Sequence, residues 1–128
     1  MIGRLPLNIA NITLHGLHLA IVLGASVGWI FCETRLATLL LQAAIALSWA
    51  AIGPLVGKPF GYCLVTDMQW RVRRGIGLAE RPGGYMKYLV DGVTGRNFDA
   101  GIIDRWTARV FAASIAANLT LLAIFGWC

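Results

Sequence analysis

Charged residues are scarce in this sequence, and most of them are confined to one region. The chain has 128 residues, with 11 Lys or Arg and 6 Asp or Glu, and fourteen of these charges lie between Lys58 and Arg109. A soluble domain of this size needs polar residues over most of its surface, because its surface is large relative to its volume. The shortage excludes an ordinary soluble domain and indicates a single membrane domain over residues 1–128.

Several kinds of site are also missing. No acidic residue lies within an apolar stretch, so no buried carboxylate pair is available for acid–base work. Three widely spaced cysteines without a CxxC suggest neither a zinc site nor a disulfide framework, and no metal site is predicted. The chain has a net charge of +5, and its basic residues lie next to apolar stretches. Membrane lipids, and not nucleic acid, are therefore the predicted partners of the basic residues.

Three apolar stretches are long enough to cross a bilayer, at residues 12–31, 36–56 and 108–127. About 20 residues at about 1.5 Å each cover the roughly 30 Å hydrocarbon core. Pro54 lacks a backbone donor and is expected to kink or end the second span. The first stretch exceeds the apolar region of a signal peptide and is expected to be retained. The sequence therefore predicts an all-α, integral membrane three-helix bundle.

The distribution of Lys and Arg predicts the orientation of this bundle. Nine of them lie in the segment 57–109, and Arg4 adds a tenth on that side, against Arg35 alone on the other. The positive-inside rule then predicts a multi-pass protein of the bacterial inner membrane. The N-terminus and the segment 57–107 are expected in the cytoplasm, and the C-terminus in the periplasm.

The segment between the second and third spans is predicted to form two short amphipathic helices. Thr66 and Gln69 have the spacing of a capping box that opens the first of them. The second is expected from Tyr85 to Val93, with its apolar residues on one face. Both are expected to lie at the inner membrane surface, and the alternative is that they cap the bundle.

Polar residues within the spans are the candidates for function, because they are costly in a bilayer. His15 and His18 are three residues apart and share a helix face, and His18, Ser48 and Asn118 are expected at similar depths. One interpretation is interhelical hydrogen bonding. The other is a cofactor or proton-handling site on the two histidines. No cofactor is firmly implied, because residues three apart on one helix cannot bind opposite faces of one haem.

Small residues predict where helices pack closely. Gly16, Ala20, Gly24 and Gly28 recur every four residues along the first span. Ala113 and Ala117 repeat the spacing in the third span, where Asn118 follows, and Ser48 adds a small polar side chain in the second. This pattern predicts close packing, either within the bundle or against another subunit or a second copy of the chain. Cys63 lies far from both histidines in sequence and is interpreted as a free apolar thiol.

Scattered residues resemble those of a known family. His18-Leu19-Ala20, the Cys63-Leu64-Val65-Thr66 stretch, three nearby arginines, the Gly83-Gly84-Tyr85 turn and Asn118 occur in the order of their counterparts. This order is similar to that of small bacterial inner-membrane proteins known as domain of unknown function 2784. The resemblance implies a topology and no activity. Where the family tends to have Glu, this chain has Gln69, and the family's Glu-His pair is lost after Met86.

Two hypotheses of function follow from these features. The first is a small non-catalytic membrane protein that serves as a structural or accessory subunit and packs against other membrane proteins. The alternative is a membrane redox or enzyme component that uses His15 and His18. The small-residue pattern and the absence of carboxylates in the spans favour the first.

Overall fold

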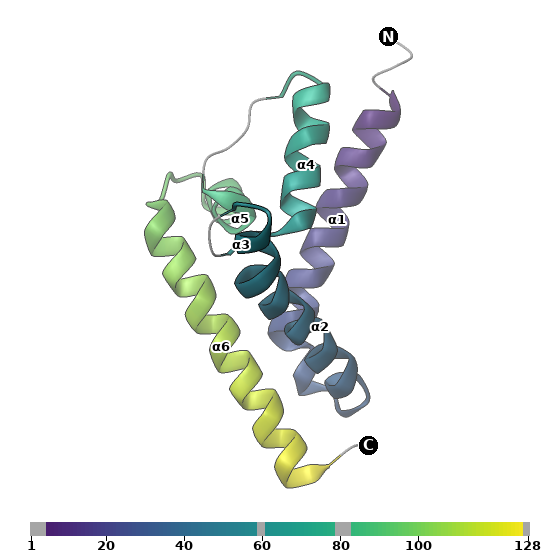
Figure 1. Cartoon of the computed structure of the whole chain (residues 1–128), viewed down its shortest axis with the longest axis vertical. Coiled ribbons are helices and arrows are strands. Elements are labelled where there is room, and N and C mark those ends of the chain that lie inside the picture. Colours follow the sequence, from purple (N-terminus) through teal and green to yellow (C-terminus); the bar gives the residue numbers. More distant parts are fainter. Residues whose placement is uncertain (1–4, 59–60, 79–82, 127–128) are drawn as a thin grey trace.

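The computed structural model describes residues 5–58, 61–78 and 83–126, and all regular structure within them is helical. The long helices are α1 (Leu5–Val27), α2 (Arg35–Leu47) and α6 (Ala100–Phe125), shown in Figure 1. Shorter elements connect them: the 3₁₀ turns η2 (Gly28–Ile30) and η3 (Cys32–Thr34), the π-helical segment η4 (Ser48–Ile52), and the helices α3 (Gly53–Leu55), α4 (Leu64–Gly75) and α5 (Gly84–Thr94).

Three helical segments among the described residues are long and apolar enough to cross a membrane. They are Leu5–Ile30, Cys32–Leu55 and Ala100–Phe125. The prediction of an all-α membrane protein with three spans is confirmed at this level. Helix α6 begins before the third predicted span, because the Asp99 side chain accepts a hydrogen bond from the Ile102 amide (2.9 Å) and caps the first turn of the helix.

Burial in the described residues is the reverse of that in a soluble protein. Large apolar side chains such as Leu40 and Phe125 are exposed by more than 60%, whereas only two apolar residues, Ala25 and Tyr85, are buried. The buried polar residues are His18, Thr38, Gln42, Gln69, Arg73, Lys87, Ser114 and Asn118. Such a surface needs lipid around it, since exposed apolar area of this extent is unfavourable in water.

A hydrogen-bonded polar cluster joins the three long helices α1, α2 and α6. The Gln42 side-chain amide donates to the Ala25 carbonyl (3.0 Å) and to the Ser114 hydroxyl oxygen (2.8 Å). The Asn118 amide donates to the Gln42 side-chain oxygen (3.3 Å) and to the Arg35 carbonyl (3.2 Å). Gln42 and Asn118 are fully buried. We call Gln42, Ser114 and Asn118 the central cluster.

The expected layer of His18, Ser48 and Asn118 is therefore wrong. Asn118 donates a hydrogen bond to Gln42, whereas Ser48, the first residue of η4, donates to the Tyr62 carbonyl (3.0 Å). His18 packs elsewhere, against Tyr85. Depth along the spans was estimated from residue counts alone, and such counts do not determine which face of each helix points inward.

Pro54 ends the second span in the expected way, with one added feature. The segment η4 before it has π-helical hydrogen bonds, and the Gly53 amide donates to the Ser48 carbonyl five residues earlier. This wider turn accommodates the ring and the missing donor of the proline. The helix then ends at Leu55.

The small residues of α1 and η2 fall into two groups. Gly24 of α1 and Gly28 of η2 lie against α2, where an added methyl group would meet the Leu41 side chain or overlap the Thr38 hydroxyl. Gly16 and Ala20 are exposed, and nothing lies within 4 Å of a methyl group added to Gly16. On α6, Ala113 is exposed and Ala117 is half-buried.

The two helices between the second and third spans differ in direction. Helix α4 runs beside the first half of α1 in the opposite sense, because Cys63 at its start lies near His18 and Gly75 at its end lies near Leu7. Helix α4 is therefore packed along α1. Helix α5 contacts α6 and is seen almost end-on in Figure 1, so it runs across the long helices. Contact of either helix with lipid headgroups stays a prediction.

The capping box predicted for α4 is wrong. The helix begins at Leu64, two residues before Thr66, and Cys63 is its N-cap residue without a side-chain hydrogen bond. Gln69 points into the protein and does not reach back toward the helix start, since it is 1% exposed. A pattern of two polar residues cannot distinguish a capping pair from one residue on the buried face of a helix.

We expect Gly28→Ala to lower the free energy of unfolding by about 1–3 kcal/mol, because the buried Thr38 side chain cannot move away from the added methyl group. The matched control is Gly16→Ala, where the methyl group meets open space, and it should be neutral or stabilising by up to about 1 kcal/mol. Unfolding titrations in detergent measure both. Equal effects of the two substitutions would show that α1 and α2 do not pack through Gly28.

Candidate functional site at the junction of helices 1, 4 and 5

His18 occupies the centre of a cluster in which α1, α4 and α5 meet. Its imidazole stacks on the ring of Tyr85 with centroids 3.6 Å apart and planes inclined by only 6°. Both residues are buried, with exposures of 6% and 3%. Two aromatic rings in face-to-face contact fix the orientation of the imidazole without any hydrogen bond.

His15 is bound by the hydroxyl group of the same tyrosine. The Tyr85 oxygen lies 3.1 Å from Nδ1 of His15 and 3.2 Å from the His15 carbonyl oxygen. Burial, with a smaller contribution from Tyr88, raises the pKa of Tyr85, so its hydroxyl group stays protonated and can donate. One tyrosine of α5 therefore contacts both histidines of α1.

Cys63 approaches the edge of the His18 ring that carries Nε2. Its sulfur lies 3.9 Å from Nε2 of His18, and the thiol is free and half-buried. Cys63 precedes the first turn of α4 in extended conformation, where N-cap residues normally accept hydrogen bonds from the helix. Cys63 lies 45 positions after His18 in the sequence, and the chain between them returns to α1 and brings the thiol beside the imidazole.

The buried face of α4 adds an amide and a cation. Gln69 is 1% exposed, and neither its side-chain oxygen nor its nitrogen has a hydrogen-bond partner in the described residues. One turn later, the Arg73 guanidinium lies 5.4 Å from the ring centres of both Trp70 and Tyr88. These cation–π contacts connect α4 to α5. We call His15, His18, Cys63, Gln69, Arg73, Tyr85 and Tyr88 the junction cluster.

A separate ion pair stabilises α5. Lys87 pairs with Asp91 on the next turn and donates to the Asn97 side-chain oxygen (2.6 Å). Asp91 also accepts from the Phe98 amide (3.0 Å), which ties the helix to the segment leading into α6. The Asp91 carboxylate thus acts in structure and stays apart from the histidines.

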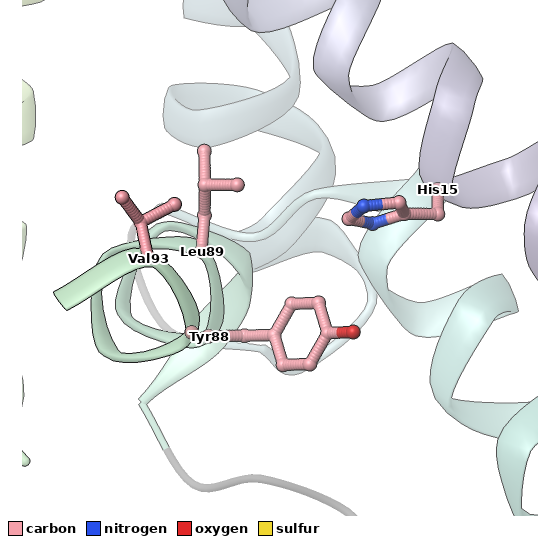
Figure 2. A pocket seen from close by; sticks show the side chains of 5 residues that line it. His15, Tyr88, Leu89 and Val93 are labelled. Atoms are coloured by element: carbon pink, nitrogen blue, oxygen red, sulfur yellow. The ribbon is translucent and has the colours of Figure 1, made fainter. Parts of the chain in front are cut away.

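An open recess adjoins the junction cluster. His15, Tyr88, Leu89, Gly92 and Val93 line a space of about 230 Å³, with the two rings on one side and the aliphatic side chains on the other (Figure 2). This volume lies below the about 300–1,000 Å³ of pockets that enclose whole ligands. The recess suits one end of an amphipathic molecule and is too small to enclose a macrocyclic cofactor.

The sequence identified both histidines of this site and missed most of their neighbours. Gln69, Tyr85 and Tyr88 come from short helices whose position against α1 is not encoded in local periodicity. The sequence gave no indication of which aromatic residue His18 contacts. None of the predicted packing residues, Ser48, Ala117 and Asn118 included, belongs to the junction cluster.

The family model described as "Protein of Unknown function (DUF2784)" matches residues 8–123. The chain belongs to this family. No curated protein and no solved structure shows significant similarity to it. Members of the resemblance noted in the sequence, His18, Cys63, Arg73 and Tyr85, come from separate segments and meet in the junction cluster. The fold thus brings together residues that had looked unrelated.

Loss of the Tyr85 hydroxyl should weaken the contact between α5 and α1. We expect Tyr85→Phe to lower the free energy of unfolding by about 1 kcal/mol, because the ring still stacks on His18 while the bond to His15 is lost. Tyr85→Leu should cost about 1 kcal/mol more, since it also removes the stacking. Tyr62→Phe is the control, because the Tyr62 hydroxyl group makes a long hydrogen bond with Asp67 (3.4 Å) and does not contact the histidines. Equal losses for Tyr85→Phe and Tyr62→Phe in detergent unfolding would contradict the assignment.

Proposed function

We propose that this chain is a membrane-embedded binding protein whose junction cluster receives a small polar or amphipathic ligand. This develops the hypothesis of a site on His15 and His18. The observation that carries it is the carboxamide of Gln69, which is buried without a partner in the described residues. His18 Nδ1, also buried, has the same property.

The two fully buried glutamines of the chain make the argument quantitative. Gln42 bonds through its nitrogen to Ala25 and Ser114 and through its oxygen to Asn118. Gln69 has none of these bonds. A buried polar group without a partner costs about 1–3 kcal/mol, and leucine at the same place avoids that cost. A bound molecule that supplies the missing partners accounts for a glutamine at this position.

The chemistry of the cluster restricts the class of ligand. Its side chains comprise one permanent cation, Arg73, together with imidazole, hydroxyl, thiol and amide groups, and no carboxylate. Such a set favours a neutral or anionic ligand that accepts hydrogen bonds. The aliphatic wall formed by Leu89 and Val93 favours an apolar portion beside the polar one.

The matched pair Gln69→Leu and Gln42→Leu tests this proposal. We expect Gln69→Leu to retain or raise the stability of protein stripped by extensive detergent exchange, and to abolish retention of the ligand. Gln42→Leu should destabilise the protein by about 1–3 kcal/mol, because it leaves the partners of Gln42 unsatisfied, while the folded fraction still retains the ligand. Thermal unfolding and native mass spectrometry of gently purified protein measure the two properties.

The absence of any retained small molecule in the wild-type protein would contradict the proposal, provided that Gln69→Leu also raises its stability. Gln69 would then be an unfavourable packing residue. Retention of the same molecule by Gln69→Leu at wild-type occupancy would also contradict it. Both outcomes are distinguishable from unfolding, because the stability of each variant is measured in the same preparation.

A role as an accessory subunit is the second candidate function. The observation that favours it is the uncovered inner half of the small-residue row on α1, where Gly16 and Ala20 are exposed. A helix of another membrane protein, or of a second copy of this chain, can approach closely there. The same native preparation identifies co-purifying proteins, and a monomer that purifies alone at full stability counts against this role.

The proposed orientation places the junction cluster at the cytoplasmic side of the inner membrane. Besides the charge distribution, the cysteines support it: Cys32, between the first two spans, is disulfide-bonded, whereas Cys63 in the junction is free. Disulfides persist in oxidising compartments, and thiols in the cytoplasm stay reduced. The sequence analysis did not anticipate the disulfide. Cys128, the remaining cysteine, lies outside the described residues.

Thiol labelling of intact cells tests the orientation. We expect a membrane-impermeant maleimide to leave Cys63 unlabelled in intact cells and to label it after the inner membrane is permeabilised. In protein denatured without reductant, Cys63 should react with maleimide and Cys32 should react only after reduction, because Cys63 is free and Cys32 is disulfide-bonded. Labelling of Cys63 in cells with an intact inner membrane would reverse the proposed topology.

A further inference from the structure

Cys63 and His18 present two soft donor atoms to one point, and no residue role assigned so far uses them together. Their facing atoms, Sγ and Nε2, lie 3.9 Å apart. A thiol–imidazole hydrogen bond of this length is weak. With metal–sulfur and metal–nitrogen bonds of about 2.3 Å and about 2.0 Å, an ion between the two atoms has a ligand–metal–ligand angle of about 130°. The observed separation therefore accommodates a bridging ion without movement of the backbone.

We propose that Cys63 and His18 form a binding site for a monovalent soft metal ion, of which Cu(I) is the representative. Thiolate and imidazole are the side chains that bind copper best among those near this point. Binding replaces the thiol proton with a metal–sulfur bond, releases that proton to solvent and leaves the oxidation state of the ion unchanged. No oxidant or reductant takes part.

Three further features of the junction support the site. The His18 ring is 6% exposed, and stacking on Tyr85 fixes Nε2 toward the sulfur. Cys63 is half-buried and so remains accessible to an incoming ion. Cys63 is the N-cap residue of α4 and makes no side-chain cap hydrogen bond, so its sulfur faces the imidazole and not the helix.

The number of donors decides between metals. No group of three or more His, Cys, Asp or Glu side chains in the described part of the chain is arranged to hold a metal ion. Zn²⁺ in proteins takes four ligands, three of them from the protein even at catalytic sites. Cu(I) is stable with two or three ligands, and an angle of about 130° between these two donors is near that of a trigonal site that one exogenous donor completes. We infer that the site discriminates in favour of Cu(I) and against Zn²⁺.

The copper site uses Nε2 of His18 and Sγ of Cys63, two atoms of the junction cluster, and its test does not depend on whether Gln69 binds the ligand proposed above. Full-length protein in detergent is titrated with Cu(I) under ascorbate, with bicinchoninate as competing chelator. Ascorbate keeps copper reduced and leaves the disulfide of Cys32 intact. We expect one Cu(I) per chain, and prior reaction of Cys63 with maleimide should prevent binding.

Two variants localise the site and guard against misfolding. Cys63→Ser should weaken Cu(I) binding by more than about tenfold while leaving the stability close to wild type. His18→Phe keeps an aromatic ring against Tyr85 and removes both nitrogens, and we expect the same loss. His15→Phe is the matched control, because His15 does not contact Cys63, and its Cu(I) affinity should stay within about threefold of wild type.

Any of three results overturns the proposal. The first is Cu(I) binding that Cys63→Ser and His18→Phe leave unchanged, which would place the copper elsewhere on the protein. The second is Zn²⁺ binding at this site as tight as that of Cu(I), which would require additional ligands. The third is a folded wild-type protein that takes up no Cu(I) against the chelator.

Discussion

The side chain of Gln42 is the interaction on which the arrangement of the three long helices depends. Its amide connects the Ala25 carbonyl of α1 to the Ser114 hydroxyl of α6, and its oxygen receives the Asn118 amide. In a bilayer, apolar side chains gain little by leaving lipid for a protein interior, so polar contacts and close packing must supply specificity. Each of the three helices loses a partner if Gln42 is removed, and no apolar core of comparable size replaces it.

The central cluster and the junction cluster obey different rules. In the first, Gln42 and Ser114 have partners within the described chain, and the helices approach closely at Gly28. In the second, the imidazole of His18 and the amide of Gln69 are buried with bonding capacity left over. In the central cluster the Asn118 side-chain oxygen lacks a partner among the described residues, whereas in the junction cluster the whole carboxamide of Gln69 and Nδ1 of His18 do. A satisfied polar group rigidifies a fold, and spare donors and acceptors can bind a ligand. This contrast is why function is assigned to the junction.

The sequence predicted the features that depend on composition and failed at those that depend on which face of each helix points toward its neighbours. Spans follow from hydropathy, and the effect of Pro54 follows from its missing donor, so both were anticipated. Gln42 is a polar residue within a span, but residue counts give its depth and not its rotation about the helix axis, so they did not identify it as the partner of Asn118. Cys63 and Tyr85 reach α1 only through the packing of α4 and α5, which short amphipathic patterns do not specify. The site was therefore known by its two histidines and not by their partners.

The identity of residue 69 determines what the junction can accept. Gln69 lies one helical turn from Arg73. A carboxylate at position 69 would add a negative charge near the guanidinium and make the cluster more attractive to cations. The amide of Gln69 is neutral, and the Arg73 guanidinium makes cation–π contacts with Trp70 and Tyr88. An electron-rich ligand completes this arrangement, whereas for a cationic one the soft sulfur and imidazole nitrogen at the other edge of His18 are the only suitable donors.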